Sequence, residues 1–144
     1  MPVFLRPSSL LLVFGGGSFG TLLRELVQLG LGPQAGIPIA TSVVNVAGAL
    51  LLGVLLEALT RRGADEGAWQ RTRLLLGTGL LGGFTTYSAV AESMALMLRE
   101  GSGGLAIAYG LGTVLCGGLA SWCGILIGAR LGSPAPDPSA AADV

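Results

Sequence analysis

Four long apolar stretches with very little charge constrain this chain more than any other feature of its sequence. They run over residues 9–28, 38–59, 74–98 and 105–131. Each reaches the ~20 residues that an α-helix needs to cross the hydrocarbon core of a bilayer. Only 11% of the residues are charged, against about 25% in a typical soluble domain. The sequence therefore predicts an all-α membrane protein with four transmembrane helices.

The domain organisation follows from how little sequence lies outside these stretches. The connections are short, and residues 61–71 form the only strongly polar one. Residues 1–132 are therefore expected to form a single transmembrane domain. Residues 133–144 are rich in proline and alanine. Because such a composition buries too little apolar surface to pack, a disordered C-terminal tail is predicted there.

Composition also excludes several classes of function. All eight basic residues are arginines and the formal net charge is zero, so no basic surface is available to bind nucleic acid. Histidine is absent, which removes the commonest general base and metal ligand. No nucleophile has a recognisable activating base. We therefore expect that the protein is not an enzyme and has no nucleic-acid partner. Membrane lipid is expected to surround its helices.

The third stretch contains a cluster of poor helix formers at its centre. These residues are Gly82, Gly83, Phe84, Thr85, Thr86, Tyr87 and Ser88. Glycine, β-branched threonine and serine all disfavour a helix interior. An interrupted helix at membrane depth is tolerated only where protein covers it or where it lines a wet cavity. The pattern predicts a third helix broken at its centre, either as a flexible packing face or as an ion site.

Other polar residues lie within the predicted helices. Asn45 is placed to donate a hydrogen bond to an anion or to bind the backbone of a neighbouring helix. Tyr109, Thr113 and Gly117 are spaced four apart and share one helix face, which is either a polar track for a small ion or a packing face. Arg24 is either an interfacial anchor or a positive charge at a vestibule. The residue types alone leave each pair of alternatives open.

The distribution of arginine predicts how the chain is inserted. With four crossings, both termini and the polar connection share one side of the membrane. That side holds six arginines, and the other holds two; the six are Arg6, Arg61, Arg62, Arg71, Arg73 and Arg130. Positively charged residues stay in the cytoplasm. We therefore predict a multi-pass protein of the cell membrane with both termini in the cytoplasm.

Taken together, four motifs in this order resemble the CrcB/Fluc family of fluoride channels. The motifs are Gly16-Gly17-Ser18-Phe19-Gly20 with Arg24, Val44-Asn45-Val46-Ala47-Gly48, the cluster at residues 82–88, and Tyr109/Thr113/Gly117. The resemblance covers about residues 12–131. It implies a dimer of two subunits inserted in opposite orientations that exports cytoplasmic fluoride passively.

The resemblance also implies roles for individual residues. A structural sodium ion at the dimer centre would be held by the backbone carbonyls of Gly82 and Thr85. The residues implied to line the pore are Asn45, Tyr87, Tyr109 and Thr113. Arg24 matches the family's arginine at the wide mouth of the pore. Gly83, Phe84, Thr86 and Ser88 complete the helix break.

The sequence departs from the family pattern at two positions beside the break. Ala89 and Val90 stand where the family has threonine and phenylalanine, so one of two aromatic residues facing fluoride is missing. The arginine bias also disfavours insertion in both orientations. Both observations favour a heterodimer with an inverted paralogue over a homodimer. A small proton-coupled multidrug-type exporter and a non-conducting assembly subunit are the alternative functions.

Overall fold

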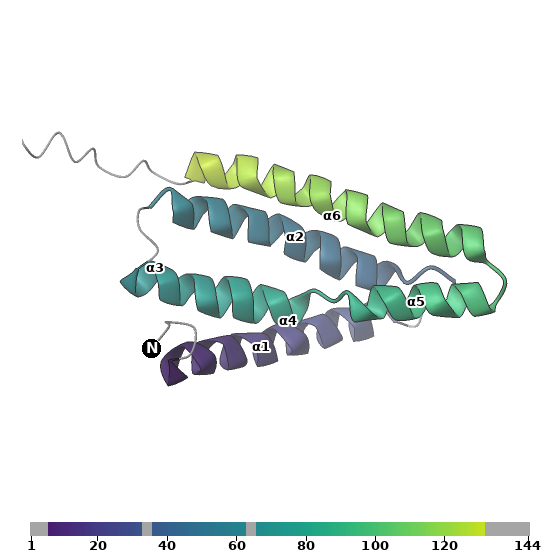
Figure 1. Ribbon diagram of the computed structural model, residues 1–144, viewed down its shortest axis with the longest axis horizontal. Helices are drawn as coiled ribbons and strands as arrows, with labels where there is room; N and C mark the ends of the chain where they lie inside the picture. Colours follow the sequence, from purple (N-terminus) through teal and green to yellow (C-terminus); the bar gives the residue numbers. More distant parts are fainter. Residues whose placement is uncertain (1–5, 33–35, 63–65, 132–144) are drawn as a thin grey trace, which may run out of the picture.

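The computed structural model describes residues 6–32, 36–62 and 66–131, which form four long helical segments lying side by side (Figure 1). All four are long and apolar enough to cross a membrane. They are α1 (Pro7–Leu31), α2 (Ile39–Thr60), the composite segment Gly67–Arg99 and α6 (Gly103–Leu131). The prediction of four spanning helices is confirmed. The predicted disordered tail, residues 133–144, lies outside the described residues.

The third segment is built from four pieces rather than one continuous helix. It contains α3 (Gly67–Thr72), the π-helix η2 (Arg73–Leu81), the short turn α4 (Gly82–Phe84) and α5 (Ser88–Arg99). At the end of η2, the Gly82 amide donates a hydrogen bond to the carbonyl of Gly77, five residues earlier, which is the spacing of a π-helix. Helical structure stops after Phe84 and resumes at Ser88, so the segment bends near its middle (Figure 1).

This interruption is shorter than the predicted cluster at residues 82–88. Gly82, Gly83 and Phe84 are helical, and Ser88 begins α5. Gly83 serves close packing instead of breaking the helix, whereas Gly82 is helical and exposed. A Cβ atom on Gly83 would overlap the backbone of Gly17 in α1. The break itself therefore consists of Thr85, Thr86 and Tyr87.

Two helix pairs make up the bundle, and small residues bring their backbones together. α2 packs along α6, and α1 packs against η2 and α4. A Cβ atom on Gly53 or Gly124 would overlap a backbone carbonyl of the facing helix, and the same holds for Gly16 and Gly20 between α1 and η2. Such contacts are typical of membrane helices, where van der Waals packing replaces the hydrophobic effect as the force that joins helices.

The interior is accordingly small, and most large apolar side chains face outward. Val44 is the largest fully buried side chain among the described residues. A compact cluster between α5 and α6 contains Val90, Met97, Ala106 and Tyr109, with Met94 packed against it. Outside this cluster, leucine, isoleucine and phenylalanine side chains cover the surface, as is expected of helices that face lipid.

Candidate functional site

The chain leaves the helix at Thr85, where the backbone turns to an extended conformation with φ −79° and ψ 156°. The Thr85 amide donates to the Leu81 carbonyl at 3.0 Å, and the Thr85 hydroxyl donates to the same oxygen at 2.9 Å. A threonine hydroxyl that binds the preceding turn competes with the helical pattern. This local bond helps to end the helix here.

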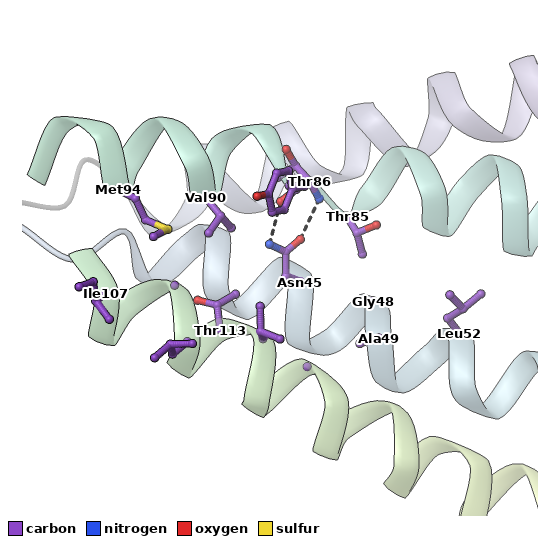
Figure 2. A pocket seen from close by; sticks show the side chains of 15 residues that line it. Asn45, Gly48, Ala49, Leu52, Thr85, Thr86, Val90, Met94, Ile107 and Thr113 are labelled. Carbon is purple, nitrogen blue, oxygen red and sulfur yellow. Dashed lines mark hydrogen bonds between the residues drawn. The ribbon is translucent and has the colours of Figure 1, made fainter. Parts of the chain in front are cut away.

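Asn45 of α2 holds the next residue of the break through both ends of its side-chain amide (Figure 2). Its Nδ2 donates to the Thr86 carbonyl at 2.9 Å, and its Oδ1 accepts from the Thr86 amide at 2.8 Å. The side chain thus binds both backbone groups of one residue, as a neighbouring strand would. Of the two roles open for Asn45 in the sequence, the structure shows the bond to a neighbouring backbone.

Hydroxyl groups satisfy the beginning of α5. The Thr86 Oγ1 accepts a hydrogen bond from the Ala89 amide at 3.3 Å and lies 3.1 Å from the Ser88 Oγ. The first amides of a helix lack acceptors within the helix. The Thr86 hydroxyl provides an acceptor for one of these amides, that of Ala89. Thr86 and Ser88, both predicted in the break, therefore contribute to restarting the helix.

Arg24 lies against the break from the side of α1. Its guanidinium donates to the Gly83 carbonyl at 3.2 Å, and the Thr21 hydroxyl donates to the same oxygen at 3.4 Å. The contact of Arg24 with Glu25 is longer, at 3.9 Å. A positive charge at the C-terminal end of a helical segment also interacts favourably with the helix dipole. The arginine predicted at a vestibule thus bonds the backbone that ends α4.

The carbonyl groups at the break divide into bonded and free. Those of Leu81, Gly83 and Thr86 accept the hydrogen bonds described above. Within the described part of the chain, no donor is found for the carbonyls of Gly82 and Thr85. Free carbonyl oxygens are hard ligands that suit a hard cation. These two groups are also the ones that the resemblance assigned to sodium.

An open groove of about 630 Å³ runs beside the break between α2, α5 and α6. Its lining is mostly apolar, with polar groups from Asn45, Thr85, Thr86, Tyr87 and Thr113. Figure 2 shows Asn45, Val90 and Thr113 gathered around it from three different helices. Tyr87 is 82% exposed, whereas Val90 is 5% exposed. The retained aromatic ring therefore faces outward, and the position that lacks one faces the interior.

A second groove, of about 750 Å³, lies between α2 and α6. Tyr109 lines this second groove and not the first, and Thr113 lines both. Tyr109 is 6% exposed, and its hydroxyl is buried without a hydrogen-bond partner. The Thr113 hydroxyl donates to the Tyr109 carbonyl at 2.8 Å. Tyr109 and Thr113, which the sequence placed on one helix face, thus differ: only the Tyr109 hydroxyl is free to donate a hydrogen bond.

A fluoride-sized anion requires hydrogen-bond donors, so the free donors matter most. Thr113 has committed its only hydrogen to the backbone, and Thr86 lies in a chain of hydroxyl contacts. Tyr109 keeps an uncommitted hydroxyl. Asn45 keeps one of its two Nδ2 hydrogens, because an amide nitrogen carries two. Asn45 lines the first of the two mostly apolar grooves, and Tyr109 lines the second.

Sequence reasoning missed Thr21 as a contributor to this arrangement and named Gly48 only as part of a motif. Thr21 precedes Arg24 by three residues, so both lie on one face of α1 and reach the same carbonyl; this spacing was the available signal. Gly48 follows Asn45 by one turn, and a Cβ atom there would overlap the Thr85 side chain. Glu92 lies on an exposed part of α5, and no hydrogen bond or ion pair involves its side chain within the described residues.

Fold and site together define a class: a small multi-pass membrane protein whose polar groups converge on a break in its third spanning helix. Within the described ranges, no group of three histidine, cysteine or acidic side chains could hold a metal ion. The sequence profile of the family described as "CrcB-like protein, Camphor Resistance (CrcB)" matches residues 11–125. The chain belongs to this family, as its sequence motifs indicated.

Curated relatives agree with this assignment over most of the chain. "Fluoride-specific ion channel FluC 2" of Leifsonia xyli is 46% identical over 132 residues, which cover 91% of this chain and 90% of the relative. "Fluoride-specific ion channel FluC 1" of Cutibacterium acnes is 42% identical, with 81% and 82% covered. "Fluoride-specific ion channel FluC" of Deinococcus radiodurans is 41% identical, with 81% and 91% covered. These relatives are named as ion channels and not as enzymes.

Proposed function

We propose that this chain is a subunit of a fluoride-specific ion channel that lets fluoride leave the cytoplasm passively. The observation that carries the proposal is the 46% identity to a fluoride-specific channel over 91% of the chain. The site supports it, because Asn45 and Tyr109 line mostly apolar grooves and each keeps an uncommitted donor. A channel conducts a strongly hydrated ion only if its lining replaces the hydration shell.

The pore residues of the proposal are Asn45, Tyr87, Tyr109 and Thr113. Thr113 lines both grooves, so the fluoride path passes this residue. Tyr87 presents a ring whose positive edge can face an anion, and its high exposure suits a contact with a second subunit. Arg24 adds a fixed positive charge beside the break. This charge attracts anions toward the groove.

A structural sodium ion at the centre of the dimer is part of the proposal. The carbonyls of Gly82 and Thr85 fit this ion, since both lack a donor among the described residues while their neighbours are bonded. Such an ion supplies a fixed charge that joins two helix breaks. It takes no part in redox or acid–base chemistry.

The partner in the proposal is an inverted subunit, and a paralogue fits better than a second copy. Val90 is packed in the interior of its own subunit, so the chain presents one aromatic residue, Tyr87, where the family has two. Both termini are placed in the cytoplasm of the cell, by the arginine distribution.

Two alternative functions remain as outcomes of the test. A proton-coupled exporter needs a carboxylate inside its first helix, whereas Glu25 is exposed near the end of α1. A non-conducting assembly subunit would complete the dimer without offering a pore of its own.

Fluoride efflux from liposomes tests the proposal directly. The purified chain is reconstituted alone, and together with an inverted paralogue, with sodium present and chloride efflux as the control. Fast efflux of fluoride and not chloride, from either preparation, is expected. The absence of fluoride efflux from both preparations, with folded protein, would contradict the channel function. Rescue by the paralogue alone would identify a heterodimer.

A further inference from the structure

Asn45 uses both functional groups of its side-chain amide to bind the backbone of one residue, Thr86. The two bonds to Thr86 measure 2.9 and 2.8 Å. Thr86 belongs to no helix, so its amide and carbonyl have no helical partners. Unsatisfied backbone groups at membrane depth cost several kcal/mol each. The side chain therefore replaces the missing helical bonds of this residue.

We infer that Asn45 is a positioning residue, which acts on ion binding and conduction by holding the backbone amide and carbonyl of Thr86 in place. The inference deepens the proposed function and rests on it. Through Thr86, Asn45 fixes the orientation of the adjoining Thr85 carbonyl. That carbonyl is one of the two left free for a cation.

The bonding pattern along the break supports this role. Gly83 is held from α1 by Arg24 and Thr21, and Thr86 is held from α2 by Asn45. The free carbonyls of Gly82 and Thr85 each precede one of these anchored residues. Anchoring Gly83 and Thr86 leaves their two predecessors little freedom to rotate. The two flanking helices thus select which carbonyls stay available.

The position of Asn45 on α2 makes it a rigid anchor. α2 packs along α6 through glycine contacts in which added side-chain atoms would overlap backbone. One turn further, Gly48 leaves room for the Thr85 side chain. The anchor and the space that receives the break therefore lie on the same face of one well-packed helix.

Amide hydrogen exchange of Thr86 tests the inference without measuring ion flux. With selective ¹⁵N-threonine labelling, the Thr86 amide is followed beside those of Thr21 and Thr113, which lie inside α1 and α6. Asn45→Ala is expected to speed exchange at Thr86 by roughly tenfold or more, the effect of losing a hydrogen bond worth about 1.4 kcal/mol. Exchange at Thr21 and Thr113 is expected to stay unchanged, whereas general unfolding would speed all three.

Asn45→Asp separates the two bonds, and Thr113→Val is the matched control. An aspartate keeps an oxygen that accepts from the Thr86 amide, so this variant should retain slow exchange at Thr86. Thr113 lines the same groove, but its hydroxyl donates to the Tyr109 carbonyl of its own helix and not to the break. Thr113→Val should leave exchange at Thr86 unchanged. Exchange at Thr86 that is equally slow in Asn45→Ala and in the unaltered chain would overturn the inference.

Stabilisation by sodium gives a second readout that separates this inference from the proposed function. The melting temperature of the purified protein is measured against sodium concentration, with potassium as replacement. Asn45→Ala should raise the sodium concentration for half-maximal stabilisation roughly tenfold, while Thr113→Val leaves it unchanged. If sodium does not stabilise the unaltered chain, the proposed sodium site is wrong, and the exchange at Thr86 alone still decides the role of Asn45.

Discussion

At the scale of single residues, what a side chain offers depends on which of its hydrogens is already committed. Thr113 and Tyr109 both carry a hydroxyl on neighbouring turns of α6. The Thr113 hydrogen is bonded to the Tyr109 carbonyl, while the Tyr109 hydroxyl is buried and unpartnered. Since a buried donor without an acceptor costs free energy, Tyr109 is the stronger candidate for meeting an anion.

Replacing Tyr109 by phenylalanine should therefore separate stability from function. The ring and its packing against Val90 and Met97 remain, and only the unpartnered hydroxyl is lost. We expect the free energy of unfolding to stay the same or to rise by about 1 kcal/mol, because an unsatisfied polar group is removed. Fluoride efflux should fall roughly tenfold if the hydroxyl donates to the ion, a bond worth about 1.5 kcal/mol. A less stable protein with normal efflux would show that the hydroxyl has another partner.

At the scale of helices, glycine determines which pairs of elements come into contact. Gly16 and Gly20 of α1 lie against the backbone of η2. Because Gly79 of η2 faces Val13 and Gly16 of α1, the backbone of η2 is reachable from this side. This contact brings Arg24, one turn beyond Gly20, to the carbonyl of Gly83.

The substitutions Gly20→Ala and Gly15→Ala form a matched pair on α1. A Cβ atom on Gly20 would overlap the Leu80 carbonyl, whereas one on Gly15 finds nothing within 4 Å. Gly20→Ala should lower the free energy of unfolding by about 1–3 kcal/mol, the usual cost of overpacking. Gly15→Ala should change it by less than about 1 kcal/mol, in the stabilising direction, because alanine favours a helix. Thermal unfolding followed by tryptophan fluorescence checks both, and equal effects would contradict this packing.

At the scale of the whole molecule, the charged end of the bundle is distinct from the rest. The start of α1, the end of α2, α3 and the end of α6 lie at one end (Figure 1). Arg61 pairs there with Glu57 at 2.7 Å, and Arg62 lies over the Trp69 ring at 5.1 Å. This end therefore gathers most of the positive charge that directs insertion.

Insertion in one orientation is the expected result of this asymmetry. A fluorescent reporter that folds only in the cytoplasm should be bright when it is fused after Val144. A phosphatase reporter at the same place, which is active only outside the cytoplasm, should be inactive. Replacing Arg61, Arg62 and Arg71 together by serine should increase the inverted fraction, since the bias weakens. Comparable activity of both reporters in the unaltered chain would support a homodimer and contradict the proposed pairing with a paralogue.

Much of the architecture was predictable because it depends on local composition. Length and apolarity predicted four spanning helices, and poor helix formers located the interruption within three residues of its observed limits. The glycines misled this reasoning. Both Gly82 and Gly83 remain helical, and Gly83 packs against the backbone of α1. A sequence does not tell whether a glycine is present for its flexibility or for its small size.

By itself the sequence determined that this chain lies in a membrane, how many times it crosses and to which family its motifs belong. These properties follow from the transfer of side chains into hydrocarbon and from the order of residues. Only the tertiary structure decided that Asn45 holds Thr86, that Arg24 binds Gly83 and that Val90 faces inward. Hydrogen-bond partners far apart in the sequence meet only after helices pack, so their pairing depends on three-dimensional contact.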